Sequence, residues 1–174
     1  MLIIEDGTGK PDAQSYVDVA GFRAFAAARG IPVPSDDTEG NAKVEQSLIA
    51  AIDYLETMVC FQGRKTKAEQ ALSWPRKGVY IDDELYPDNV IPADIKTAQM
   101  RLTVESINGI DLMPTISGNA ADFVVKEKVG PIETEYADPT KFSGRATFTA
   151  VDALLAKWLG DKCRQGVSFK VYRG

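Results

Sequence analysis

The side chains of this sequence that could do acid–base chemistry are carboxylates and lysines, because the chain contains no histidine. This absence excludes Ser-His-Asp and Cys-His nucleophilic machinery, histidine-ligated zinc and haem, and the commonest general base near neutral pH. The two cysteines, Cys60 and Cys163, are too few for a structural zinc site, and we expect both to be small, partly buried core residues. The sequence therefore predicts a protein that is not an enzyme, with no catalytic residue, metal or cofactor.

Two groups of carboxylates could still bind a cation or act as an acid–base pair. The acidic stretch 82–88 lacks the alternating ligands and the following glutamate of a calcium loop, which favours a solvated loop. Glu133 and Glu135 point to the same side of an expected strand, but strand edges commonly carry such pairs. A carboxylate-based hydrolase is therefore the weakest function considered, and it would require a pocket holding carboxylates of raised pKa.

One local surplus of basic residues surrounds an aromatic residue. Arg64, Trp74 and Arg76, with Lys65 and Lys67 nearby, combine the cations and the flat ring that hold single-stranded nucleic acid. In the alternative interpretation, Trp74 packs this loop onto the rest of the protein and the cations stay in solvent. The whole chain carries 20 Lys and Arg against 25 Asp and Glu, a net charge of −5, which disfavours tight binding to phosphate backbones.

The hydrophobic pattern predicts about four helices around one core. A length of 174 residues predicts a single domain over 1–160, followed by a C-terminal tail at 161–174. No apolar run approaches the ~20 residues of a membrane helix, and the acidic Glu5-Asp6 after the first four residues is unlike a secretory signal, so we expect synthesis in the host cytoplasm and no membrane partner. The expected helices run from Asp18 to Arg29, from Val44 to Val59 after a polar linker at 35–40, from Pro92 to Ile107, and from Val151 to Leu159.

The remaining segments are extended or irregular. Residues 1–16 predict an N-terminal arm with a turn, and 123–136 predict a β-hairpin around Gly130-Pro131. The stretch 61–92 is an irregular excursion of unusual length, which indicates that it has a role. The tail alternates like a strand without an evident partner strand, so we expect it to contact another chain through Val167, Phe169, Val171 and Tyr172. In the alternative interpretation, the tail is a disordered end. The fold class expected is thus mainly α, with a small β part and extended arms.

Several motifs together resemble a family of tailed-phage head-tail connector, or adaptor, proteins, whose members are often labelled DnaT-like single-stranded-DNA-binding proteins. The resemblance spans Glu5 to about Leu155. It is carried by Glu5-Asp6-Gly7-Thr8-Gly9 with Ser15-Tyr16-Val17, Ala28-Arg29-Gly30, Ala50-Ala51-Ile52-Asp53-Tyr54-Leu55, Phe61-x-Gly63-Arg64, Gln70-Ala71-Leu72-x-Trp74-Pro75-Arg76, Ile91-Pro92, Lys126-Glu127-Lys128-Val129-Gly130-Pro131 and Ala150-Val151-Asp152-x-Leu154-Leu155.

The resemblance implies a structural virion protein in the neck between head and tail. Such a protein forms a ring, commonly a dodecamer, beneath the portal protein and above a tail-side neck or tail-terminator protein, and genome DNA passes through the ring without tight binding. The acidic charge suits a channel wall through which DNA slides. The alternative function is single-stranded-DNA binding through Arg64, Trp74 and Arg76.

Overall fold

Four α-helices make up most of the regular structure in the part of the chain that the computed structural model describes, residues 2–114, 126–129, 132–135 and 148–160. The expected tail residues, 167–172, lie outside these ranges, and the division into a domain and a tail stays a prediction. The helices are α1 (Val19–Ala27), α2 (Thr38–Met58), α3 (Ala93–Ile107) and α4 (Thr149–Leu155), which continues into the short 3-10 helix η2 (Ala156–Trp158).

The strands are short and form antiparallel pairs. β1 (Arg64–Lys65) pairs with β2 (Arg76–Lys77), β3 (Tyr80–Ile81) with β4 (Glu84–Leu85), and β5 (Lys126–Val129) with β6 (Ile132–Glu135). The predicted fold class, mainly α with a small β part, is confirmed, and β5–β6 is the hairpin expected near 123–136. The pairs β1–β2 and β3–β4 were not expected, because strands of two residues leave no periodic pattern.

Aspartate caps fix where the first two helices begin. The Asp18 carboxylate accepts a hydrogen bond from the Gly21 N–H at 2.7 Å, and the Asp37 carboxylate accepts one from the Gly40 N–H at 2.7 Å. The second bond is the main reason why the pKa of Asp37 is lowered. α2 therefore begins inside the segment expected to be a linker, and a side chain at Gly40 would collide with the Ser35 carbonyl.

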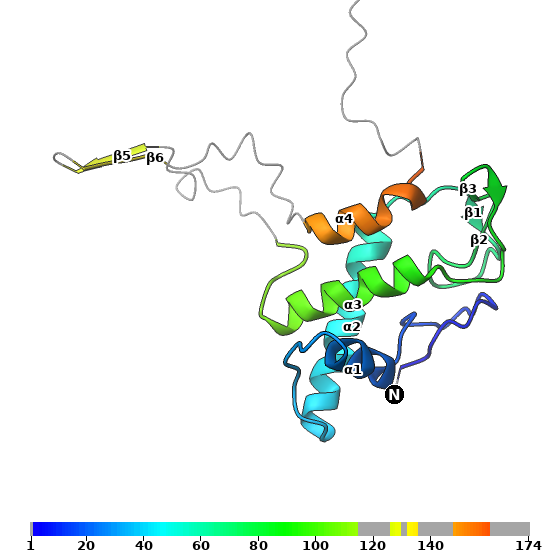
Figure 1. Cartoon of the computed structure of the whole chain (residues 1–174), viewed down its shortest axis with the longest axis horizontal. Coiled ribbons are helices and arrows are strands. Elements are labelled where there is room, and N and C mark those ends of the chain that lie inside the picture. The colour runs from blue at the N-terminus through cyan, green and yellow to red at the C-terminus, as the bar shows by residue number, and fades with distance from the viewer. Residues whose placement is uncertain (1, 115–125, 130–131, 136–147, 161–174) are drawn as a thin grey trace, which may run out of the picture.

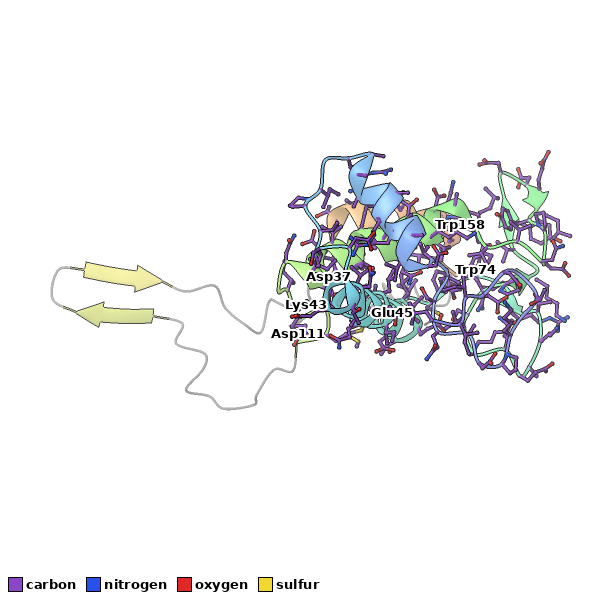
Figure 2. The ribbon with its side chains drawn as sticks, turned by 90° about the horizontal axis from the view of Figure 1, so that it is seen from below. Asp37, Lys43, Glu45, Trp74, Asp111 and Trp158 are labelled. Carbon is purple, nitrogen blue, oxygen red and sulfur yellow. The ribbon has the colours of Figure 1, made fainter. Side chains whose placement is uncertain are left out.

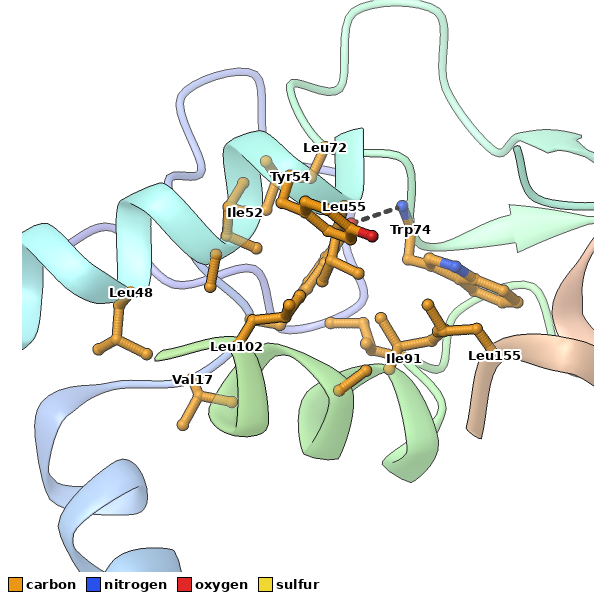
Figure 3. Packing of buried hydrophobic residues seen from close by; sticks show 14 of the residues in the cluster. Val17, Leu48, Ile52, Tyr54, Leu55, Leu72, Trp74, Ile91, Leu102 and Leu155 are labelled. Atoms are coloured by element: carbon orange, nitrogen blue, oxygen red, sulfur yellow. Dashed lines mark hydrogen bonds between the residues drawn. The ribbon is translucent and has the colours of Figure 1, made fainter. Parts of the chain in front are cut away.

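The core forms where α3 crosses α2 and α4 lies along α3 (Figure 1). α2 contributes its expected apolar stripe, which includes Leu48, Ile52 and Leu55, and α3 contributes Leu102. Figure 3 shows these side chains meeting between the helices, with Leu155 and Trp74 closing one end. Burying each such aliphatic side chain stabilises the fold by about 1.5–3 kcal/mol.

A buried amide ties the N-terminal segment to this core. Gln99 on α3 is fully buried, and its Nε2 donates to the Ser15 hydroxyl at 2.6 Å and to the Leu48 carbonyl at 3.2 Å. Its Oε1 accepts from the Tyr16 N–H at 3.1 Å. Because a buried amide without partners is costly, these bonds specify how the N-terminal segment passes over α2 and α3.

The glycine-rich turn near the N-terminus holds a carboxylate of its own chain. Glu5 is 1% exposed, and its carboxylate accepts hydrogen bonds from the N–H groups of Gly7 at 2.8 Å, Gly9 at 2.9 Å and Lys10 at 2.7 Å. Gly7 has a φ of 102°, and a side chain there would collide with the Asn89 carbonyl. The expected N-terminal arm is thus a folded loop that packs against the excursion 61–92.

The end of the last helix returns to the start of that excursion. Phe61 and Leu159 form an antiparallel bridge, and the Gly160 N–H donates to the Cys60 carbonyl at 3.0 Å. Cys60 is exposed, so the expectation of a small, partly buried core cysteine was wrong at this position. Cys163 lies outside the described residues. The hydrophobic pattern of α2 had already ended before Cys60, so burial there had no periodic support.

Candidate functional site

Trp74, the aromatic residue of the predicted nucleic-acid site, is a core residue. Its side chain is fully buried and makes edge-on ring contacts with Phe61, Tyr86 and Trp158 at centroid distances of 5.9, 6.1 and 5.4 Å. Figure 2 shows Trp74 and Trp158 next to each other at one end of the helical body. Stacking with a nucleobase requires a free ring face, so this burial removes Trp74 from the candidate contacts to nucleic acid.

Arg76 is also used inside the protein. Its guanidinium donates to the carbonyl groups of Gln62 at 2.7 Å, Gly63 at 2.8 Å, Ser73 at 3.2 Å and Phe61 at 3.3 Å. Burial is the main reason why the pKa of Arg76 is lowered. Because the N–H groups of the guanidinium bind these carbonyl groups and close the loop around 61–63, the guanidinium is not free to bind a phosphate.

A polar network that the sequence analysis missed fastens the same loop to α2. The Tyr16 hydroxyl donates to Glu56 Oε1 at 3.0 Å and accepts from the Trp74 N–H at 3.1 Å. The Ser73 N–H and hydroxyl each donate to the Glu56 carboxylate at 2.8 Å. Burial, and next the charge of Glu56, raise the pKa of Tyr16 well above its ordinary value. Nothing in the spacing of these residues signals the network.

A second network joins α3 to η2. The Asp94 carboxylate accepts from Lys157 Nζ at 2.8 Å and from Trp158 Nε1 at 3.0 Å. The bond from Lys157 is the largest effect and holds the pKa of Asp94 below its ordinary value. Burial opposes it, and the bond from Trp158 adds a smaller lowering. The hydrogen bond to Asp94 is the main reason why the pKa of Lys157 is raised.

The pair β1–β2 is composed of cations. Arg64 lies opposite Lys77, and Lys65 lies opposite Arg76, at one end of the helical body (Figure 1). Like charges opposite one another destabilise a strand pair. The structure offsets this repulsion with carbonyl groups, since Lys65 Nζ donates to the carbonyls of residues 70 and 71 and Lys77 Nζ to that of residue 66.

No carboxylate in the described ranges forms an ion pair with these cations. Arg64 and Lys67 are exposed. Arg64 and Arg76 lie on paired strands but are not cross-strand partners, so their side chains leave opposite faces of the pair. The exposed Arg64 and Lys67, with the half-buried Lys65 and Lys77, are the cations left to meet an anionic partner. The exposed aromatic residue nearest along the chain is Tyr80, which is 60% exposed.

The hairpin β3–β4 is acidic at its tip. Its two turn residues, Asp82 and Asp83, have positive φ values of 51° and 66°, as in a type I′ turn, and Glu84 follows at once. Among the described residues, no group of three or more potential ligands is arranged to hold a metal ion. The carboxylates are therefore a charged surface of the hairpin.

One groove opens between α3 and α4, beside the loop that follows α1. It has a volume of about 570 Å³ and is mainly apolar. Its lining includes Ile31, Arg101, Val104, Glu105, Ile110 and Phe148. Only one carboxylate lines it, so it lacks the paired carboxylates of a glycoside hydrolase. None of the described helices is long and apolar enough to cross a membrane.

The fold and the site define a small, mainly α protein whose irregular loop is closed by buried aromatic and arginine side chains and presents two charged hairpins. A protein-family model described as "Putative DnaT-like ssDNA binding protein" matches residues 1–174, and the chain belongs to this family. No curated protein and no solved structure matches the chain. The family description corresponds to the alternative function of the sequence analysis and gives no support to the resemblance to head-tail connectors.

Proposed function

We propose that the chain is a structural, non-enzymatic protein of a tailed phage, a head-tail connector that forms a ring beneath the portal in the neck of the virion. The observation that carries this proposal is the use of Trp74 and Arg76. Both belong to the Gln-Ala-Leu-x-Trp-Pro-Arg motif of the resemblance, and both are engaged inside the fold. The motif thus stabilises the fold, which is the role that we expect of it in a protein that works by assembly.

The charge of the chain favours the same proposal. A net charge of −5 on a ring that surrounds DNA repels the phosphate backbone, which lets the genome slide. The partners of the proposal are the portal protein, a tail-side neck or tail-terminator protein, and further copies of the chain. In this proposal, the tail residues Val167, Phe169, Val171 and Tyr172 contact the portal or an adjoining subunit.

The second candidate is single-stranded-DNA binding, and the family description is the observation that favours it. Arg64, Lys65, Lys67 and Lys77 have no ion-pair partner among the described residues. These cations would meet the phosphates, and Tyr80 would replace Trp74 as the stacking residue. Affinity from such contacts falls steeply as salt is added.

One experiment separates the two candidates. The purified protein is titrated with labelled single-stranded DNA at low salt, and in parallel it is passed over immobilised portal rings of the phage that encodes it. Capture by the portal without DNA binding supports the connector. Salt-sensitive DNA binding that Arg64→Glu plus Lys67→Glu abolishes, without capture by the portal, supports the second candidate and overturns the first. The control is Arg101→Glu plus Lys96→Glu on α3, which makes the same change in net charge away from the hairpins.

A further inference from the structure

Two neighbouring hairpins of this protein carry opposite charges that are not neutralised within the described residues. β1–β2 presents the exposed Arg64 and, on the same face, its cross-strand partner Lys77, while β3–β4 presents carboxylates at 82–84. Only Gly78 and Val79 separate β2 from β3 along the chain. Gln62 Nε2 donates to the Tyr80 carbonyl at 3.2 Å, so the base of one hairpin is bonded to the other.

The acidic hairpin also exposes an apolar pair. Tyr80 and Leu85 are direct cross-strand partners, which places their side chains on one face, and they are 60% and 62% exposed. Their strand neighbour Ile81 is partly buried and packs against the core, as the alternation of a strand requires. Aromatic and aliphatic side chains are typical of the buried centre of a protein interface. This exposed pair therefore suits a contact with another protein.

Within the part of the chain that the structure describes, the carboxylates of this hairpin have no ion-pair partner. No described cation forms an ion pair with Asp82, Asp83 or Glu84. The charge of Asp82 contributes a small part of the raised pKa of Lys157, but Lys157 is already paired with Asp94 at 2.8 Å. The three carboxylates therefore remain available to cations of another molecule.

The arrangement of charge selects the kind of partner. A nucleic acid approaching the cations would meet the carboxylates of the adjacent hairpin, and repulsion there would cancel much of the attraction. A molecule that offers carboxylates to the cations and cations to the carboxylates avoids this repulsion. Such a partner is present in every solution of this protein, because a second copy carries the same hairpins.

We propose that β3–β4 of one copy docks on β1–β2 of another, with Tyr80 and Leu85 covered in the contact and residues 82–84 opposite Arg64, Lys67 and Lys77. This inference deepens the proposed ring by assigning its contact surfaces, and to that extent it rests on the proposed function. The contact joins two different surfaces, so it can repeat from copy to copy.

Three variants of the full chain test the contact by sedimentation velocity at low salt. The first, Asp82→Asn, Asp83→Gly and Glu84→Lys, changes the hairpin charge by four units and installs an Asn-Gly type I′ turn, which both positive φ values favour. The second, Arg64→Glu plus Lys67→Glu, changes the charge by four units in the other direction at exposed positions. The third, Tyr80→Ser plus Leu85→Ser, removes the apolar pair. The control, Asp12→Lys plus Asp53→Lys, matches the charge change of the first variant at exposed sites elsewhere.

We expect the wild-type protein to associate, and each of the three variants to weaken the association by about tenfold or more. The control should associate like wild type. An equimolar mixture of the first two variants should recover association, because the reversed charges then face each other. A wild-type protein that stays monomeric at all concentrations overturns the proposal, as does a mixture that fails to associate. Labelled single-stranded DNA is added to the same samples, and strong binding to wild type that the second variant abolishes would assign the cations to DNA instead.

The outcome is separable from that of the portal experiment. If portal rings capture wild type and the three variants equally, and the variants assemble on the portal like wild type, the proposed function stands and the assigned contact fails. If the charge reversals abolish and restore self-association while portal rings capture nothing, the contact stands and the connector function fails.

Discussion

Replacing Trp74 distinguishes a core residue from a nucleic-acid contact. A tryptophan buries about 150–250 Å², and at ~25 cal/mol per Å² complete burial contributes about 4–6 kcal/mol as an upper bound. Trp74 is fully buried and has three edge-on aromatic partners, each of which adds about 0.5–1.5 kcal/mol in such pairs. We therefore expect Trp74→Ala to lower the free energy of unfolding by about 3–5 kcal/mol.

A second substitution keeps the test informative if the alanine variant does not fold. Trp74 Nε1 is the one buried side-chain nitrogen or oxygen among the described residues without a hydrogen-bond partner. Trp74→Phe removes this unpaired group together with part of the ring, so we expect it to cost less than Trp74→Ala. Urea unfolding followed by circular dichroism measures both. An alanine variant within about 0.5 kcal/mol of wild type, or one that loses DNA binding at full stability, would refute the assignment of Trp74 to the core.

Three further predictions concern the networks that hold the loops. Tyr16→Phe leaves the Trp74 N–H without an acceptor and should lower the free energy of unfolding by about 1–3 kcal/mol in urea, whereas Tyr80→Phe, at an exposed position, should change it little. Glu5→Gln removes charge from a carboxylate that accepts three N–H groups and should cost about 1.5–3 kcal/mol; an unchanged urea midpoint would contradict this. Because the pKa of Asp94 is lowered in the folded protein, its stabilisation is present above its unfolded pKa of about 3.9 and is lost as pH falls through the folded value. The melting temperature of Asp94→Asn should therefore fall less than that of wild type as the pH is lowered through this range. Thermal melts recorded at a series of acidic pH values measure the difference.

The helices could be predicted because their causes are local. Asp18 caps α1, and the spacing of Val44, Leu48, Ile52 and Leu55 places one face of α2 in the core. The start of α2 was predicted too late because the cap, Asp37, lies in a polar stretch that hydrophobic periodicity does not register. Local rules thus gave the type of each helix more reliably than its first residue.

The candidate site could not be predicted because burial of an isolated aromatic residue depends on contacts far away in the sequence. The Trp74 ring packs against Phe61, Tyr86 and Trp158, and none of these positions carries a sign of that contact in the local pattern. Arg76 is likewise satisfied by carbonyl groups, which every residue has. A cation beside an aromatic residue predicts nucleic-acid binding only where both remain at the surface.

This burial bears on what the shared motif can say about function. The motif Gln-Ala-Leu-x-Trp-Pro-Arg would mark a binding site if its side chains reached the surface, yet Gln70, Leu72 and Trp74 are buried, and Arg76 closes a loop. Such a motif stabilises the fold. The residues that decide between DNA and protein partners must therefore lie among the exposed ones. In the described ranges, Arg64, Lys67 and Tyr80 are exposed residues that both candidate functions would use. Each hairpin can have its charge reversed in a separate variant. Each variant is then tested for binding to DNA, to portal rings and to the variant in which the other hairpin is reversed, which tests both functions on the same residues.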